Sequence, residues 1–154
     1  MLRRDDESLV TLPYWALELL LGAMQYSAAV DIWAAGCIWA EMAINRMCFP
    51  GVTHVDVLFG IFRHLGTPSR PTWPGSRSLA HWSKEFPKWE ALGLGIVWPG
   101  LTSAIGNDGV ELLQAALFYD PMNRPSVASV LSHKYFACFT KASLQVRTRA
   151  VHQG

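Results

Sequence analysis

The stretch "YWALELLLG" at residues 14–22 decides the fold, because it carries a single charge among apolar side chains. Glu18 stands between Leu17 and Leu19, and the apolar run around it predicts burial. A buried carboxylate needs a cation or several hydrogen bonds, since an unpaired charge in an apolar interior is costly. These residues alone leave two interpretations open: Glu18 lies at the surface, or an arginine distant in the sequence pairs with it.

The composition indicates one globular domain. The chain has 154 residues, of which 51% are hydrophobic, and a formal net charge of +1. This length suits a single domain with a sizeable core. The near-neutral charge gives no electrostatic reason to expect nucleic acid or an acidic membrane surface as a partner. Cys37, Cys48 and Cys138 form no CxxC pair, which predicts buried thiols in a reducing compartment, the cytoplasm and/or the nucleus. No signal peptide is expected either, because acids follow the basic residues of "MLRRDDES".

Apolar periodicity predicts helices and no strands. The helix expected at 27–45 is apolar all round, which is typical of a helix at the centre of a globule. A membrane span is the weaker alternative, because Asp31 and Glu41 interrupt a short run. Residues 67–106 are rich in Pro, Trp and Gly and predict a long, loop-rich insert, and residues 140–154 predict a flexible tail. The further helices are expected at 53–66, 107–119 and 126–136.

A search for catalytic and ligand-binding motifs finds none. The five histidines show no metal-ligand spacing. The "GLG" at 93–95 lacks the third glycine of a dinucleotide-binding loop. No Walker lysine motif and no GxSxG elbow occur. We therefore expect no catalytic residue, no cofactor site and no metal site in this chain.

Several motifs in a fixed order resemble one known family. "TLPYWALELLLG" (11–22), "YSAAVDIWAAGCIWAEM" (26–42) and "YDPMNRPSVASVLSHKYF" (119–136) resemble segments of the large lobe of eukaryotic protein kinases. Between them, the order "LGTP", "WPG" and "FPKW" resembles the cyclin-dependent kinase branch, whose large lobe carries an extra insert there. The resemblance implies a mainly α fold, the lower helical subdomain of a kinase-like domain. It makes residues 1–139 a partial kinase domain that begins with the end of the activation segment at 1–26.

The resemblance also assigns roles to individual residues. It implies that Glu18 pairs with Arg124, which lies in the corner between the last two predicted helices. This pair would be structural. Asp31 matches the acid that holds the backbone of the catalytic loop from the central helix in kinases. Its alternative role is that of an acid near a helix N-terminus, where the macrodipole favours it.

Two binding surfaces follow from the same resemblance. Leu9 and Val10 match the apolar wall of the pocket that accepts a substrate proline, whereas Trp15 replaces the arginine that the family has beside that pocket. Val55 and Asp56, with the insert, resemble the surface that binds a small adaptor subunit in the cyclin-dependent branch. The implied partners are therefore a cyclin-type or small adaptor subunit and protein substrates.

The family reaction is ATP- and magnesium-dependent phosphorylation of serine and threonine hydroxyls. It needs a Gly-rich loop, a strand lysine, an HRD loop and a DFG aspartate, and none of these occurs in the 154 residues. We therefore expect this chain alone to be inactive. The alternatives are a non-catalytic interaction module or decoy that binds kinase partners, and a non-functional relic, which would expose Trp33 or Trp39.

Overall fold

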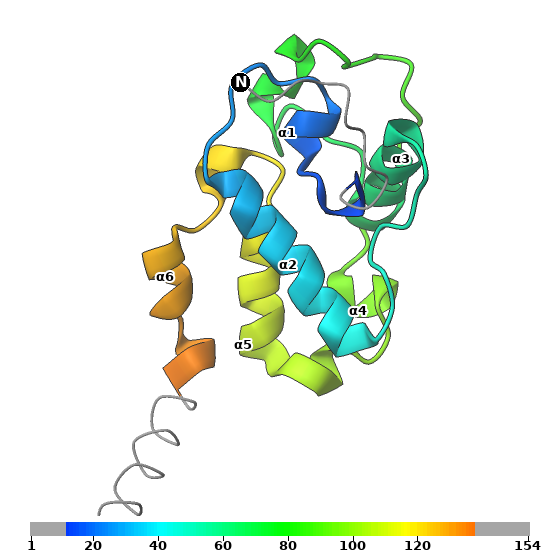
Figure 1. The fold of residues 1–154 in the computed structure, drawn as a ribbon. Helices are drawn as coiled ribbons and strands as arrows, with labels where there is room; N and C mark the ends of the chain where they lie inside the picture. Colours follow the sequence, from blue (N-terminus) through cyan, green and yellow to red (C-terminus); the bar gives the residue numbers. More distant parts are fainter. Residues whose placement is uncertain (1–11, 138–154) are drawn as a thin grey trace, which may run out of the picture.

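A computed structural model gives the fold and describes residues 12–137 (Figure 1). These residues form α-helices and short 3-10 helices (η), with no strand among them, so the prediction of a mainly α fold is confirmed for this part of the chain. In chain order the elements are η1 (Leu12–Tyr14), α1 (Leu17–Leu20), α2 (Ala29–Ile44), α3 (His54–Leu65), η2 (Pro74–Ser78), α4 (Leu94–Val97), α5 (Leu101–Ala116), η3 (Pro121–Asn123) and α6 (Val127–Leu131).

Helix α2 joins several elements of the fold, because it packs against α5, η1 and η3. Its buried residues follow a stripe of one helical face: Trp33, Gly36, Cys37 and Ala40. At Gly36 the two long helices approach closely, because a Cβ there would lie 3.2 Å from the Cβ of Ala116. The absence of a side chain at this position therefore sets the distance between α2 and α5.

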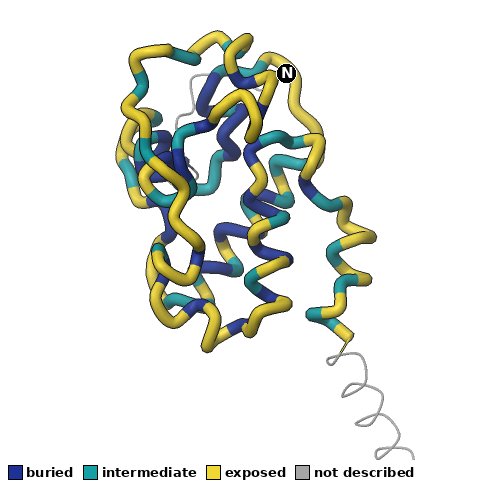
Figure 2. Tube along the Cα trace, turned by 180° about the vertical axis from the view of Figure 1, so that it is seen from behind, coloured by how far each residue is buried: buried dark blue, intermediate teal, exposed yellow. Residues whose placement is uncertain are grey.

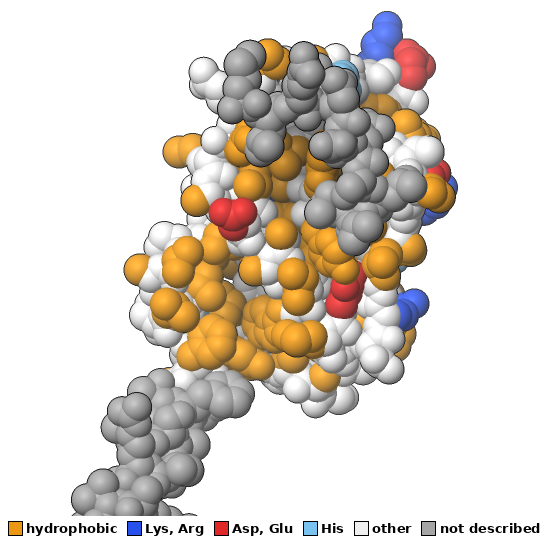
Figure 3. All heavy atoms as spheres, viewed as in Figure 1, with side chains coloured by type: hydrophobic (Ala, Val, Ile, Leu, Met, Phe, Trp, Pro, Cys, Tyr) orange, Lys and Arg blue, Asp and Glu red, His pale blue; other side chains and the backbone are white. Residues whose placement is uncertain are grey.

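The opposite face of α2 is not buried among the described residues. Ile38 is 49% exposed and Met42 is 73% exposed. The helix predicted at the centre of the fold is therefore buried on one face, and apolar side chains are exposed on the side of the molecule seen in Figure 3. The hypothesis of a non-functional relic predicts instead that Trp33 or Trp39 is exposed. Trp33 is fully buried, and the ring of Trp39 packs 5.0 Å from that of Tyr135.

Aromatic rings pack against one another in the core, among them Trp33, Phe49, Phe62, Trp73 and Trp98. Trp33 stacks on Phe49 with ring centroids 6.1 Å apart and on Tyr119 at 6.5 Å. Phe49 in turn lies 5.7 Å from Trp98, which precedes α5. Such rings bury large apolar areas and prefer offset or tilted contacts like these. The core thus joins α2, the "FPG" turn after it and the end of the insert.

Helix α5 differs most from its predicted bounds. It begins at Leu101, before the predicted start at 107, and ends at Ala116 rather than at 119. Gly106 has a φ of 67° inside it and makes a kink near the predicted start. Leu101 is fully buried, so packing stabilises a first turn whose Gly, Thr and Ser residues would favour a loop.

The predicted insert, 67–106, is therefore not a loop throughout. It contains η2 and α4, and its last residues belong to α5. Much of it is exposed on the outside of the molecule (Figure 2). Two tryptophans anchor it, since Trp73 and Trp98 are both buried.

The last predicted helix, 126–136, is interrupted. Ser126 caps α6, as the Ser126 Oγ accepts a hydrogen bond from the Ser129 N–H at 3.1 Å, but α6 ends at Leu131. A second helical stretch starts at Lys134. The Lys134 ammonium forms ion pairs with Asp108 and Glu111 of α5 at 3.0 and 2.7 Å, which ties this stretch to the rest. The tail predicted at 140–154 lies outside the described residues.

Cys37 and Cys48 are free and buried, and we predict that neither thiol reacts in the folded chain. Burial raises the pKa of Cys48 to about 12 and that of Cys37 well above its ordinary value, so the reactive thiolate is scarce at pH 8. In a Cys138→Ser variant, Ellman's reagent should label no thiol until guanidinium is added, and then both. Rapid labelling of one thiol per chain without denaturant would contradict this.

Candidate functional site

Glu18 lies in α1, a single turn of helix whose other residues are almost all apolar. Leu17 and Leu20 are buried beside it, and Glu18 itself is only 3% exposed. The surface position that its sequence left open is therefore excluded. The carboxylate needs a partner inside the protein.

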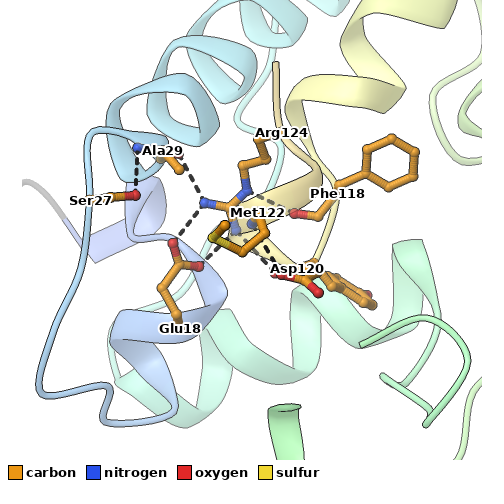
Figure 4. Close-up of polar contacts among 8 residues, drawn as sticks. Glu18, Ser27, Ala29, Phe118, Asp120, Met122 and Arg124 are labelled. Carbon is orange, nitrogen blue, oxygen red and sulfur yellow. Dashed lines mark hydrogen bonds and ion pairs between the residues drawn. The ribbon is translucent and has the colours of Figure 1, made fainter. Parts of the chain in front are cut away.

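Arg124 reaches this carboxylate from the corner after α5. Asp120 opens η3, where its Oδ1 accepts a hydrogen bond from the Met122 N–H at 3.0 Å, and Pro121 fixes the first residue of that turn. The backbone then extends at Arg124, which is 7% exposed. This turn aims the guanidinium inward at Glu18 (Figure 4).

The two side chains form a bidentate ion pair across 106 positions of sequence. Arg124 Nη1 donates to Glu18 Oε1 and Nη2 donates to Oε2, both at 2.7 Å. The planar guanidinium matches the two carboxylate oxygens, which makes this one of the stronger hydrogen-bonding arrangements in proteins.

Backbone carbonyls take the remaining donors of Arg124. Nε donates to the Phe118 carbonyl at 2.8 Å, Nη1 to that of Ala29 at 2.9 Å and Nη2 to that of Tyr119 at 3.3 Å (Figure 4). All five guanidinium N–H groups thus have an acceptor. The guanidinium carbon also lies 5.0 Å from the centre of the Trp33 ring, whose face attracts cations.

This site joins three segments rather than performing chemistry. Glu18 belongs to α1, the Ala29 carbonyl to the first turn of α2, and the Phe118 and Tyr119 carbonyls to the segment that follows α5. Every hydrogen-bonding group of the pair is engaged, so none is free to bind a substrate. The arrangement is a structural tie.

Asp31 lies in the first turn of α2 and is exposed. None of the described residues forms a hydrogen bond or ion pair with its carboxylate. Its place near the helix N-terminus is one where the macrodipole favours an acid. Its role as an anchor for a catalytic loop stays a prediction.

The residues predicted to form a substrate pocket are only partly described. Leu9 and Val10 lie outside the described residues. Trp15 is half-buried, and its ring meets that of His54 edge-on at 5.1 Å, so it covers the N-terminus of α3. The substrate pocket stays a prediction.

Val55 and Asp56, the predicted adaptor surface, lie at the start of α3. Val55 is 54% exposed, as a docking residue would be. Asp56 closes a capping box: its Oδ2 accepts from the Thr53 N–H at 3.0 Å, while its own N–H donates to the Thr53 hydroxyl at 3.1 Å. Asp56 therefore has a structural use that the resemblance did not indicate.

Sequence reasoning missed a second carboxylate contact, made by the partly buried Glu41. Tyr14 donates its hydroxyl to Glu41 Oε2 at 2.9 Å, and the Cys48 N–H donates to Oε1 at 3.1 Å. The hydrogen bond to Glu41 raises the pKa of Tyr14. This contact holds η1 and the turn after α2 together. A lone Glu on an apolar helix was the only sequence signal for it.

Among residues 12–137, no three His, Cys, Asp or Glu side chains are placed to hold a metal ion together. In the same range, no helix is both long and apolar enough to cross a membrane.

The helical fold and the buried Glu–Arg tie define a class, the helical subdomain of kinase-like domains. The family model of the protein kinase domain matches residues 3–136, which is most of the chain. The chain therefore belongs to the protein kinase domain family.

We predict that Arg124→Ala lowers the free energy of unfolding by roughly 3–5 kcal/mol, because it leaves the Glu18 carboxylate buried without a partner. Arg124→Lys should also be destabilising, since an ammonium cannot serve five acceptors in a plane. The control is Arg70→Ala, an exposed site where we expect a change within about 0.5 kcal/mol. Urea titrations followed by circular dichroism measure all three. Small, equal effects of the two alanine variants would exclude the tie.

We also predict that the carboxyl group of Asp56 titrates below its ordinary pKa of 3.8. Hydrogen bonds with the side chain and the backbone of Thr53 stabilise the carboxylate. Because the folded pKa is lowered, this contribution to stability is present above the unfolded pKa and is lost as the pH falls through the folded pKa. Carbon-detected NMR titration measures it. Thr53→Ala should raise the pKa and Thr53→Ser should keep it low; a native value of 3.8 or above would contradict the capping box.

Proposed function

We propose that this chain is the C-terminal part of the large lobe of a serine/threonine protein kinase of the cyclin-dependent type. The complete domain would transfer a phosphoryl group from ATP, with magnesium, to protein hydroxyls. Its partners would be a cyclin-type or small adaptor subunit and protein substrates, in the cytoplasm and/or the nucleus. The family membership supports the kinase part of this proposal, and the insert supports the cyclin-dependent type.

The cyclin-dependent subtype is supported by hydrogen bonds that join two of the insert motifs to each other. The Thr67 N–H of "LGTP" donates to the Trp89 carbonyl of "FPKW" at 2.9 Å. The Thr67 hydroxyl donates to the Pro87 carbonyl at 2.7 Å and accepts from the Trp89 N–H at 3.0 Å. Trp73 of "WPG" is buried. The residues that carry the resemblance are thus the residues that hold the insert in place.

On this proposal the chain by itself does not transfer a phosphoryl group. That reaction needs cations and hydrogen-bond donors around the phosphates and a base beside the acceptor hydroxyl. The described residues offer no cluster of carboxylates for magnesium, and the sequence has no Gly-rich or HRD motif. These residues do not fit ATP and magnesium, and we derive no catalytic step from them.

The exposed face of α2 supports a second candidate function, a non-catalytic interaction module. Apolar side chains gather over α2 and α6 on the face seen in Figure 3, with few charges among them. Large apolar patches usually mark surfaces that another protein covers. In the first proposal the remainder of a kinase domain covers this face, and in the second a separate kinase partner does.

We predict that the purified chain transfers no phosphate. Incubated with radiolabelled ATP, magnesium and a serine-proline peptide, it should give the incorporation of a blank, because it lacks the groups that neutralise the transferred phosphate. An active cyclin-dependent kinase in the same buffer is the positive control. Incorporation above the blank that persists after repurification would contradict the proposal.

The size of the endogenous protein separates the two candidates. An antibody against residues 67–106 should detect a band much heavier than 17.1 kDa if a catalytic half is part of the same polypeptide. A single band at 17.1 kDa would overturn the first proposal and favour the interaction module.

A further inference from the structure

A cavity of about 500 Å³ lies in the insert, between its first residues and the segment 82–89. Its volume falls within the range of small-ligand and peptide side-chain pockets. The residues that matter for what it could bind are aromatic and basic: Arg77, Trp82, Lys84, Phe86, Lys88 and Trp89. Val55 and Asp56 do not line it, although the insert that forms it belongs to the predicted adaptor surface.

The aromatic wall of the cavity is held by the core of the protein. The Phe86 ring packs edge-on against Trp82 at 5.5 Å and against Phe62 of α3 at 5.6 Å. The Trp89 ring lies 5.7 Å from Phe59 of the same helix. Because these rings rest on α3, the apolar surface is formed before any ligand arrives, which reduces the entropy lost on binding.

The rim of the cavity is basic and largely unpaired. Among the described residues, neither Arg77 nor Lys88 forms an ion pair, and Lys84 has only a 4.0 Å contact with Glu85 between two exposed side chains. Residues 63–90 carry five basic residues against two acidic ones, a net charge of +3, whereas the whole chain has +1. The positive charge is thus concentrated around this cavity.

The hydroxyls at the cavity are already used within the protein. The Thr67 hydroxyl bridges Pro87 and Trp89. The Ser69 and Thr72 hydroxyls hydrogen-bond to each other at 3.1 Å, and the Ser83 hydroxyl accepts from the Glu85 N–H at 3.1 Å. The groups left for recognition are therefore the apolar wall and the basic side chains of the rim, which suit an apolar side chain with negative charges beside it.

We propose that this cavity binds an acidic peptide. One apolar or aromatic side chain of the peptide packs on Trp82, Phe86 and Trp89, and flanking carboxylates pair with Arg77 and Lys88. A free inorganic anion would leave the aromatic wall unused, and a neutral apolar peptide would leave the cations unpaired, so the two features together favour a peptide that supplies both. The proposal stands on the insert alone and does not depend on catalysis.

The test is fluorescence anisotropy with the full chain and a fluorescein-labelled peptide of sequence Glu-Glu-Leu-Phe-Glu-Glu. Saturable binding is expected, weakening with added salt because the rim is exposed. Two further peptides, one with Gln for every Glu and one with Gly for Leu and Phe, should each bind about tenfold more weakly, since each lacks one of the two features.

A matched pair of variants locates the binding. Arg77→Ser with Lys88→Ser should weaken the acidic peptide about tenfold, whereas Arg70→Ser, which removes a nearby charge outside the cavity, should change it less than about twofold. Circular dichroism checks that each variant is folded. If the double variant does not fold, the three peptides on the unmodified chain decide the matter.

Four results would overturn the proposal. They are no binding at up to about 1 mM peptide, equal binding of the Gln peptide, an Arg70→Ser effect as large as that of the double variant, and displacement of the peptide by inorganic phosphate at equal concentration. An equally large Arg70→Ser effect would show that diffuse positive charge attracts the peptide. Displacement by phosphate would show that the cavity binds anions alone.

Discussion

The buried pair of Glu18 and Arg124 is the interaction on which the arrangement of the described helices depends. It places the guanidinium where α1, the first turn of α2 and the segment that follows α5 meet, and each of these segments supplies an acceptor. Removing two charges from water costs much of what their attraction returns, so the pair need not contribute large net stability. Its consequence is geometric, because in this arrangement the three segments together supply acceptors for all five guanidinium N–H groups.

The sequence indicated that Glu18 needs a counterion, but it did not by itself indicate which residue supplies it. A lone carboxylate in "YWALELLLG" required a counterion if it was buried, and that step rests on elementary electrostatics. The choice of Arg124 came from the family resemblance. The carbonyls of Ala29, Phe118 and Tyr119 could not be foreseen, because every residue has a carbonyl and only the fold decides which ones face the guanidinium. The contact between the Tyr14 hydroxyl and the Glu41 carboxylate could not be foreseen either, because the two residues lie 27 positions apart and only the fold brings them together.

Element types were predictable where apolar periodicity was strong, and boundaries were not. Thr53 and Gly66 mark the ends of α3 in the sequence as in the structure, since capping and helix termination are local effects. Helix α5 starts earlier than expected because burial of Leu101 outweighs the weak propensity of its first turn. For α2, periodicity correctly indicated apolar residues on every face, but it cannot distinguish a face that the chain itself covers from one left exposed at Ile38 and Met42.

The net charge of the whole chain does not reveal the excess of basic residues in the insert, on which the binding proposal rests. A net charge of +1 argues against extended polyanions such as nucleic acids, because these need many phosphate contacts at once. A short acidic peptide needs only about two or three ion pairs. Because charges are screened beyond a Debye length of about 8 Å, such a peptide responds to the charge near its site rather than to the net charge of the chain. The excess of basic residues at 63–90 lies beside aromatic rings that α3 holds in place. Segregated charge over a preformed apolar wall can therefore give selectivity to a chain that is nearly neutral overall.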